Sequence, residues 1–415
     1  MLRPGRERTP DVDDGGAIAH GLADERDRLL SIRDETHLSS LPSGTRDMIG
    51  RVHVEQHGRR DAPVPSPAAG VSFVMPVLNE RGYLRRAVET VLAQDVPGPT
   101  ELILALGPST DGTSELAREL AREDERIVLI DNPAADIPIG LNLAIGAGRY
   151  PTVVRVDAHS ELDPSYARSA LATLERVRAA NVGGVMRADG RTPFQRAVAR
   201  AYNSPIGLGG GAYHGGTQEG EAESAYLGVM RRAVLDEVGL FDETIRRGED
   251  WELNLRIRRA GYRVWFDPTL AVTYWPRESW TRLVRQFSAT GRWRGELVRR
   301  FGRGNSLRFF APPALVLTIL LGLVIAVLQL TGVLQGWWSL VASVVYLPVL
   351  AYAVLIVGVA AGPGGGRGWR DKLWTAAVLP SMHLAWGSGF LLGVMGGAHD
   401  TVDTSRLGSR NTPLP

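Results

Sequence analysis

Short apolar runs alternate with helical patterns between residues 71 and 157. The runs are apolar throughout, which is typical of strands buried on both faces of a parallel sheet; they are residues 71–77, 101–107, 126–131 and 151–157. Apolar residues recur at helical spacing between these runs, in segments 80–94, 113–123 and 139–148. Strands that alternate with helices predict an α/β domain whose mostly parallel sheet is covered on both faces.

The polar residues of this region gather where the predicted strands end. They are Asn79 and Glu80 after the first strand, Asp111 in the loop after the second, and Asp157 and His159 at the end of the fourth. Ligands of parallel sheets bind beyond these carboxyl ends. Mg²⁺ or Mn²⁺ takes one or two carboxylates and completes its shell with water and phosphate oxygens. Asp157 is therefore a candidate metal ligand, although an aspartate also commonly caps a following helix.

A second pair of acidic residues opens a helical pattern within residues 249–264. Leu253 and Ile257 share one face of the predicted helix, and Gly261 provides its stop signal. Glu249 and Asp250 lie at its start. Acidic side chains there stabilise the helix dipole, so this pair has a purely structural interpretation beside a functional one.

Three long apolar runs follow near the C-terminus. Residues 314–334 and 337–362 carry no charge, and residues 373–397 form a weaker run. Each is long enough to cross a bilayer. Basic residues precede the first run and lie between the second and third, while the link between the first two is uncharged. The positive-inside rule therefore predicts a multi-pass protein of the cell membrane with a cytoplasmic α/β domain and a C-terminal tail outside.

A basic segment joins the two regions at residues 277–310. Trp280, Leu283, Val284 and Phe287 fall at helical spacing among many arginines. An amphipathic basic helix of this kind lies in the interface of a membrane that contains anionic lipid. A helix packed on the core of the domain is the alternative.

Composition completes the predicted organisation. Residues 1–65 are charged and poor in aromatic residues, which indicates a disordered arm. The α/β domain would then occupy 66–276, the interfacial segment 277–310, the membrane helices 311–397 and the tail 398–415. With 47 basic and 45 acidic residues the net charge is +2, which argues against a nucleic-acid partner. There is no cysteine, which excludes disulfides and thiolate metal sites. The first residues lack an apolar stretch, so no cleavable signal peptide is expected.

Several of these segments resemble the ordered motifs of family 2 glycosyltransferases with the GT-A fold. They are VSFVMPVLNERGYLRRAVETVLAQ, STDGT, GLNLAIGAGRYPTVVRVDAHS and GLFDE followed by GEDWELNLRIRRAGYRVWFDP, spread over about residues 70–300. RVDAHS, SPIGLGGGAYHGG and AYLGVMRRAVLDEVGLFDE are similar, more narrowly, to succinoglycan-type exopolysaccharide glycosyltransferases.

This resemblance implies inverting transfer of a sugar from a nucleotide diphosphate to a lipid-linked or growing glycan acceptor. It assigns contacts with the nucleotide sugar to Pro76, Asn79, Glu80, Asp111 and Asp157. Asp157 and His159 would lie at the Mg²⁺ or Mn²⁺ ion, Asp250 would be the general base, and Glu249 its neighbour in the motif. Arg292 and Trp293 would contact the diphosphate or the acceptor at the membrane surface.

Two positions depart from the family pattern. Leu106 and Gly107 stand where an aspartate usually contacts the base, so the base of the donor is open. Gln286 is also more widely spaced from Arg292 and Trp293 than in the Gln-x-x-Arg-Trp motif of processive synthases. Two alternatives therefore remain beside single-sugar transfer: a processive polysaccharide synthase, and a catalytically silent binding or scaffold subunit.

Overall fold

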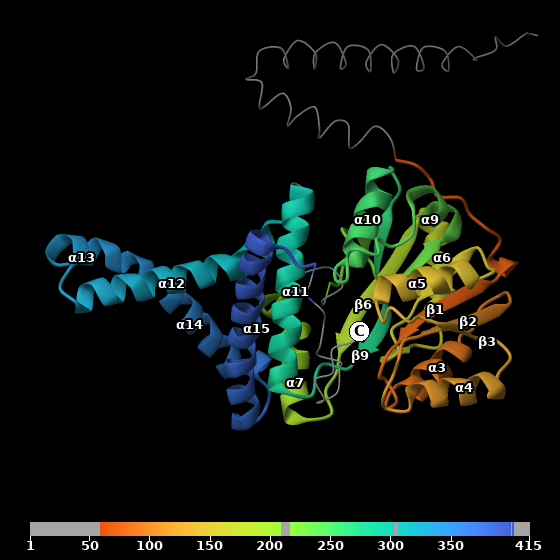
Figure 1. Cartoon of the computed structure of the whole chain (residues 1–415), viewed down its shortest axis with the longest axis horizontal. Coiled ribbons are helices and arrows are strands. Elements are labelled where there is room, and N and C mark those ends of the chain that lie inside the picture. The colour runs from red at the N-terminus through yellow and green to blue at the C-terminus, as the bar shows by residue number, and fades with distance from the viewer. Residues whose placement is uncertain (1–58, 209–215, 303–305, 400, 402–415) are drawn as a thin grey trace, which may run out of the picture. The chain divides into compact units, whose positions relative to one another are not determined.

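A sheet of nine strands organises the part of the chain that the computed structural model describes, residues 59–208, 216–302, 306–399 and 401 (Figure 1). Its strand order is β3-β2-β1-β4-β8-β6-β9-β5, and β7 pairs with β9. The strands are β1 (Val71–Val77), β2 (Thr100–Leu106), β3 (Ile127–Asp131), β4 (Thr152–Arg155), β5 (Ser160–Leu162), β6 (Asn181–Ala188), β7 (Gly220–Glu221), β8 (Tyr226–Arg231) and β9 (Val264–Tyr274).

Two apolar cores cover the two faces of this sheet. One packs α3 (Leu84–Leu92), α4 (Thr113–Glu123) and α6 (Tyr166–Val177) against Phe73 and Met75. The other packs α5 (Ile137–Ala147), α9 (Arg232–Val238) and α10 (Glu249–Arg259) against Val74. Alternate residues of β1 thus enter opposite cores, which explains why the predicted strands are apolar throughout.

The predicted α/β architecture is confirmed, and the structure adds an antiparallel element. β1, β2, β3 and β4 pair in parallel, while β8 inserts antiparallel between β4 and β6. The chain also joins the domain earlier than residue 66. Arg60 forms a parallel bridge with Tyr262, and Ala62 is buried. Most of the expected disordered arm (1–58) and most of the tail (402–415) lie outside the described residues.

A pair of long helices borders the α/β domain. α11 (Trp280–Phe301) and α15 (Trp369–Gly396) run side by side (Figure 1). Glycines allow their backbones to touch: a Cβ on Gly291 would lie 2.0 Å from the carbonyl oxygen of Trp386, and one on Gly393 would lie 1.9 Å from that of Arg292. The same device brings membrane helices close together.

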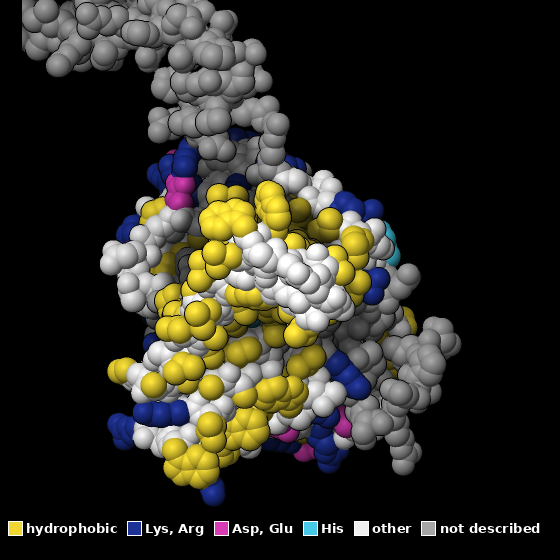
Figure 2. Space-filling view, turned by 90° about the vertical axis from the view of Figure 1, so that its left-hand side faces the viewer, with side chains coloured by type: hydrophobic (Ala, Val, Ile, Leu, Met, Phe, Trp, Pro, Cys, Tyr) yellow, Lys and Arg dark blue, Asp and Glu magenta, His cyan; other side chains and the backbone are white. Residues whose placement is uncertain are grey.

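A helical hairpin projects away from the sheet (Figure 1). It contains α12 (Ala311–Leu330), α13 (Gly336–Ala342) and α14 (Tyr346–Ala361). Its apolar side chains are largely exposed, including Leu330 (88 %) and Trp338 (70 %). Figure 2 shows this face covered by hydrophobic side chains, with arginine and lysine toward its edges. Among the residues that the structure describes, three helical segments are long and apolar enough to cross a membrane: 307–330, 336–361 and 369–396.

The third of these segments differs from the other two in its packing. In its most apolar stretch of 18 residues, 39 % of the residues are buried, against 17 % and 6 % in the other two segments. The mean hydropathy of this stretch is 1.3, against 2.5 in each of the others. Both of its ends contact the α/β domain. Near its start, Arg200 of α7 (Pro193–Tyr202) donates to the Asp371 carbonyl; just after its end, Ala398 packs beside Trp251. These contacts pack both ends of α15 on the α/β domain; the external C-terminal tail stays a prediction.

The basic segment at 277–310 is mostly the helix α11. Its Leu283 and Phe287 are buried against α7 and α15, so the helix packs on the protein along this face. Arg299 and Arg300 both pair with the buried carboxylate of Glu296. These contacts fit the alternative of a packed helix. Contact with anionic lipid stays a prediction.

Candidate functional site

Three carboxylates meet at a buried arginine where β4 ends. Arg155 is 5 % exposed. Its Nη1 donates to Glu249 Oε1 at 3.0 Å and to Asp250 Oδ1 at 2.5 Å, and its Nη2 lies 3.3 Å from Asp157 Oδ1. The two acidic segments singled out in the sequence, far apart along the chain, therefore form one site. Arg155 itself was not predicted, because it lies hidden within an apolar strand pattern.

The start of α10 brings the second pair of acids to this site. Gly248 has φ +81°, a left-handed conformation that suits glycine, and it is the residue before Glu249. Glu249 is buried, whereas the Asp250 side chain keeps 28 % of its surface exposed. The turn thus directs two adjacent carboxylates differently, one toward the interior and one toward open space.

The pKa shifts within the cluster differ in cause for Asp250 and Arg155. Burial raises the pKa of Asp250 to about 7; Arg155 opposes the shift, and the nearby Glu249 and Asp157 add to it. For Arg155, burial lowers the pKa, but the carboxylates of Asp250, Asp157 and Glu249 outweigh it and hold the pKa well above its usual value. A carboxyl that ionises near neutral pH suits a general base.

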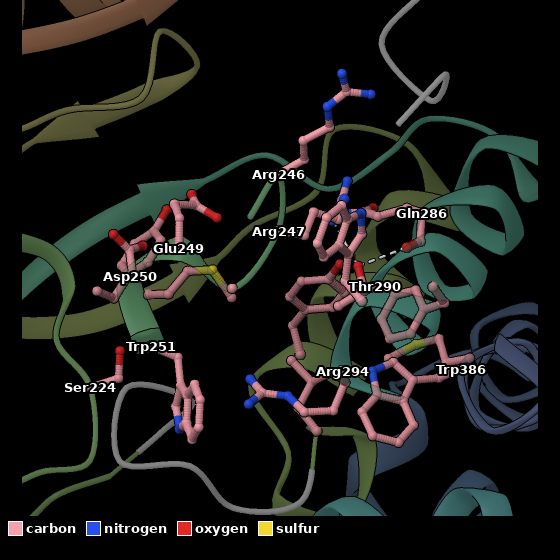
Figure 3. Close-up of a pocket in the computed structure, with 18 of the residues that line it drawn as sticks. Ser224, Arg246, Arg247, Glu249, Asp250, Trp251, Gln286, Thr290, Arg294 and Trp386 are labelled. Atoms are coloured by element: carbon pink, nitrogen blue, oxygen red, sulfur yellow. Dashed lines mark hydrogen bonds between the residues drawn. The ribbon is translucent and has the colours of Figure 1, made fainter. Parts of the chain in front are cut away.

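A cavity of about 910 Å³ opens on this cluster. Pro76, Asp157, Glu249 and Asp250 line it, and so does Trp293 of α11. Figure 3 shows the carboxylates of Glu249 and Asp250 across the cavity from Arg294 and Trp386. Its far wall is formed by residues of the projecting helices, such as Leu315 of α12 and Leu355 of α14. One space therefore joins the acidic cluster to the helices that can cross a membrane.

Asp157 and His159 have different surroundings. Asp157 lines the cavity. His159 is buried, with Nδ1 3.4 Å from Glu80 Oε1 and its ring edge-on to Tyr274 at 5.5 Å. Within the described residues no group of three or more histidines and acids could hold a metal. One carboxylate facing the cavity suits a divalent ion that takes most of its ligands from phosphate and water.

Asn79, Glu80 and Asp111 connect the loops that follow β1 and β2. Asn79, with φ 53°, accepts from the amide of Thr110 at 2.8 Å, and Asp111 accepts from the amide of Arg81 at 3.1 Å. Asp111 also accepts from the amide of Thr113 at the start of α4 at 3.0 Å. These side chains shape the loops, and they are not among the described residues that line the cavity.

The face of α11 that lines the cavity is set by helical phase. Gln286, Thr290, Trp293 and Arg294 all line it, at positions i, i+4, i+7 and i+8. Arg292 instead donates from Nε to the carbonyl of Gly397 at 2.8 Å. Arg294 is therefore the arginine of this helix that faces the cavity, and helical spacing counted from Gln286 is the signal that finds it.

Comparisons with known proteins agree with the fold and the site. Residues 72–239 match the family model "Glycosyl transferase family 2". The chain is 32 % identical to the succinoglycan biosynthesis protein ExoA of Rhizobium meliloti, over 77 % of this chain and 93 % of that protein. It is 24 % identical to a dolichyl N-acetyl-alpha-D-glucosaminyl phosphate 3-beta-D-2,3-diacetamido-2,3-dideoxy-beta-D-glucuronosyltransferase of Methanococcus voltae, over 58 % of this chain and 77 % of that protein.

Solved structures give the same fold. The mannosyltransferase PcManGT from Pyrobaculum calidifontis, in complex with GDP-Man and Mn²⁺, aligns with a TM-score of 0.50 at 16 % identity, and the alignment covers 91 % of this chain and 97 % of that one. Together, the match to the family model and the extent of the similarity to the Rhizobium protein show that the chain belongs to the family 2 glycosyltransferases.

Proposed function

We propose that the chain is a membrane-anchored, inverting glycosyltransferase that moves a sugar from a nucleotide diphosphate to a lipid-linked or growing glycan of the cell surface. The observation that carries this proposal is the meeting of Asp157, Glu249 and Asp250 around Arg155 in a cavity that reaches the projecting helices. A processive synthase is the alternative of the same class; a silent scaffold is the alternative of another class.

Each carboxylate has a distinct proposed role. Asp157 lies at the cavity wall and would hold Mg²⁺ or Mn²⁺, which offsets charge on the leaving nucleotide diphosphate when it is bound. Asp250 is partly exposed to the cavity and takes the proton from the attacking hydroxyl of the acceptor. A single displacement with a separate base inverts the anomeric carbon. Glu249 and Arg155 orient Asp250 and stay outside the proton transfer.

The nucleotide is proposed to lie beside β1 and β3. Pro76, Asn132 and Asp136 line that part of the cavity, and Asn132 Nδ2 donates to the Asp136 carbonyl at 3.0 Å. Leu106 is buried and Gly107 has no side chain, so neither supplies an acid. Asn132 and Asp136 are the polar side chains that would contact the base. Asn79, Glu80 and Asp111 act through the shape of the neighbouring loops.

The two lipid-facing helices are proposed to be the membrane anchor. α12 leaves the α/β domain and α14 returns to it, so a hairpin crosses twice and both of its ends stay on the side of the site. α15 runs along α11 and the domain, as its two end contacts favour. The many basic residues beside the domain favour its cytoplasmic location.

Donor binding and transfer test this proposal when they are measured separately. Calorimetric titration with UDP- and GDP-sugars in the presence of Mn²⁺, together with a transfer assay, would be run on wild type, Asp157→Asn and Asp250→Asn. We expect Asp157→Asn to lose donor affinity. Asp250→Asn is nearly isosteric and should keep donor affinity while turnover falls by roughly 10²–10⁴. Equal loss of donor affinity in both variants would refute the division of roles, and one added sugar rather than a ladder would exclude the processive alternative.

A further inference from the structure

More basic than acidic side chains line the cavity. Six arginines and four acidic residues line it among the described residues. Each of the four acids contacts one of two arginines. Arg155 contacts Asp157, Glu249 and Asp250, and Arg246 Nε lies 3.1 Å from Asp136 Oδ2. The other four lining arginines, called here the arginine cluster, are Arg247, Arg277, Arg294 and Arg308.

Aromatic and polar contacts fix members of the arginine cluster in place. The guanidinium of Arg294 lies 4.9 Å from the ring of Trp251 and 4.1 Å from that of Phe309. Arg308 lies over the same Phe309 ring at 5.0 Å, and its Nη2 lies 3.2 Å from Glu223 Oε2. Arg247 Nη1 donates to Thr290 Oγ1 at 2.7 Å. A stacked guanidinium keeps its edge for hydrogen bonds. These contacts hold Arg247, Arg294 and Arg308 in defined positions at the cavity wall.

The arginine cluster stands between two different surfaces. Trp251, which Arg294 stacks on, follows the base Asp250 directly in α10. Phe309, which Arg294 and Arg308 share, lies two residues before α12, in the turn that leads into the hairpin. Beyond it the lining is largely apolar and comes from three helices: Pro312, Leu315, Leu355, Met382 and Trp386. In Figure 3 Arg294 lies between Asp250 and Trp386, so the order across the cavity is base, cations, then an apolar wall formed by α12, α14 and α15.

A ligand that fits this order has three parts. It needs a hydroxyl for Asp250, an anion for several guanidinium groups, and an apolar chain. Arginine forks match phosphate oxygens in pairs. A free glycan has neither an anion for the arginines nor an apolar chain for the wall. The nucleotide of the donor has phosphates but no apolar chain.

We propose that the arginine cluster binds the phosphate or diphosphate of a lipid-linked acceptor, whose chain lies against α12, α14 and α15. This inference rests on the proposed function, because it takes the hydroxyl at Asp250 as the attacking group. It specifies the acceptor as an anionic lipid-linked glycan and assigns its head group to residues on the membrane side of the base. The diphosphate of the donor stays on the Asp157 side.

Farnesyl diphosphate tests the site directly, without any transfer reaction. Its binding to the full chain in detergent micelles would be followed by tryptophan fluorescence, since Trp251, Trp293 and Trp386 line the cavity. Farnesol and inorganic diphosphate separate the contribution of the tail from that of the head group. Binding of UDP and GDP with Mn²⁺ is measured in parallel, because the nucleotide sugar donor is the other possible source of a diphosphate. The variants are Arg294→Gln and Arg308→Gln, each with its Lys counterpart. The matched control is Arg285→Gln, an exposed position of α11, the helix that carries Arg294.

The expected pattern distinguishes the acceptor from the donor. Farnesyl diphosphate should bind wild type and Arg285→Gln at least about tenfold more tightly than farnesol or diphosphate alone. Each Gln variant should weaken it about tenfold, the Lys variants less, and nucleotide binding should stay unchanged; melting temperatures verify folding. Equal binding of farnesol, loss of nucleotide binding in the Gln variants, or no binding to wild type would each overturn the proposal. If wild type does not hydrolyse any nucleotide sugar in the presence of Mn²⁺, the proposed function itself would be refuted.

Discussion

Arg155 Nη1 lies 2.5 Å from Asp250 Oδ1, so the proposed base is held by a buried cation that also contacts Asp157 and Glu249. Removal of one partner from a buried ion pair leaves the other charges uncompensated, which costs about 3–5 kcal/mol. We predict that Arg155→Met lowers the free energy of unfolding by an amount of this order. Thermal unfolding in detergent measures it, and Arg155→Lys, which keeps the charge, should lose less. A Met variant as stable as wild type would show that the cluster does not need its cation.

The position of Asp250 also predicts the dependence of transfer on pH. Its pKa is raised to about 7, and only the ionised form accepts a proton. The rate should therefore rise about tenfold per pH unit below 7 and level off above it. Initial transfer rates at saturating donor and acceptor between pH 5 and 9 measure this. A flat profile from pH 5 to 8 would remove Asp250 from the role of base.

The same shift has a consequence for stability with a fixed sign. A carboxyl whose pKa is raised on folding binds its proton more tightly in the folded state, so its contribution to stability is lost as pH rises through about 7. Asp250→Asn cannot ionise and avoids this loss. We predict that the variant gains melting temperature relative to wild type at pH 8 but little at pH 4, because the loss begins near the usual aspartate pKa of 3.8 and is complete above about 7. The reverse order would mean that the ion pair with Arg155 dominates.

How much of this site can be predicted from sequence depends on what each residue contacts. Apolar periodicity predicts β1, β2, β3 and the helices between them because these elements bury repeated patterns against one sheet. The position of β8 in the sheet cannot be predicted in this way, because its partners β4 and β6 are distant in the chain. The acidic pairs were visible because they stand at a strand end and a helix start.

The sequence analysis missed residues whose place in the site is set by long-range contacts or by the rotation of a helix about its axis. Arg155 lies inside an apolar run, and only the fold brings Glu249 to it. Arg294 rather than Arg292 faces the cavity because of the rotation of α11, which the packing of its glycines on α15 determines. Hydropathy likewise identifies α15 as apolar, but it does not distinguish a helix surrounded by lipid from a helix packed against protein.

The close packing of α11 and α15 gives a mutational test within one helix. A Cβ on Gly393 would meet the Arg292 carbonyl oxygen at 1.9 Å, a backbone atom that cannot move aside, whereas Gly396 has no neighbour within 4 Å. We predict that Gly393→Ala lowers the melting temperature in detergent by several degrees through overpacking, while Gly396→Ala leaves it unchanged or raises it slightly. Equal effects at the two positions would mean that the helix pair is not packed as described.

The final prediction concerns the course of the chain through the membrane. Because the sequence has no cysteine, a single introduced thiol can be labelled without background. Val333 lies at the exposed tip of the hairpin, Arg367 is exposed between α14 and α15, and His399 follows α15 and is 61 % exposed. If only α12 and α14 cross, Val333→Cys faces one side, and Arg367→Cys and His399→Cys face the other together with the α/β domain. A membrane-impermeant maleimide applied to intact cells should then label Val333→Cys alone, and inverted vesicles should give the opposite result. If α15 crosses instead, the thiols at 367 and 399 will react from opposite sides, which would restore the external tail and require the contacts of Trp293 and Trp251 with the residues after α15 to be absent in the membrane.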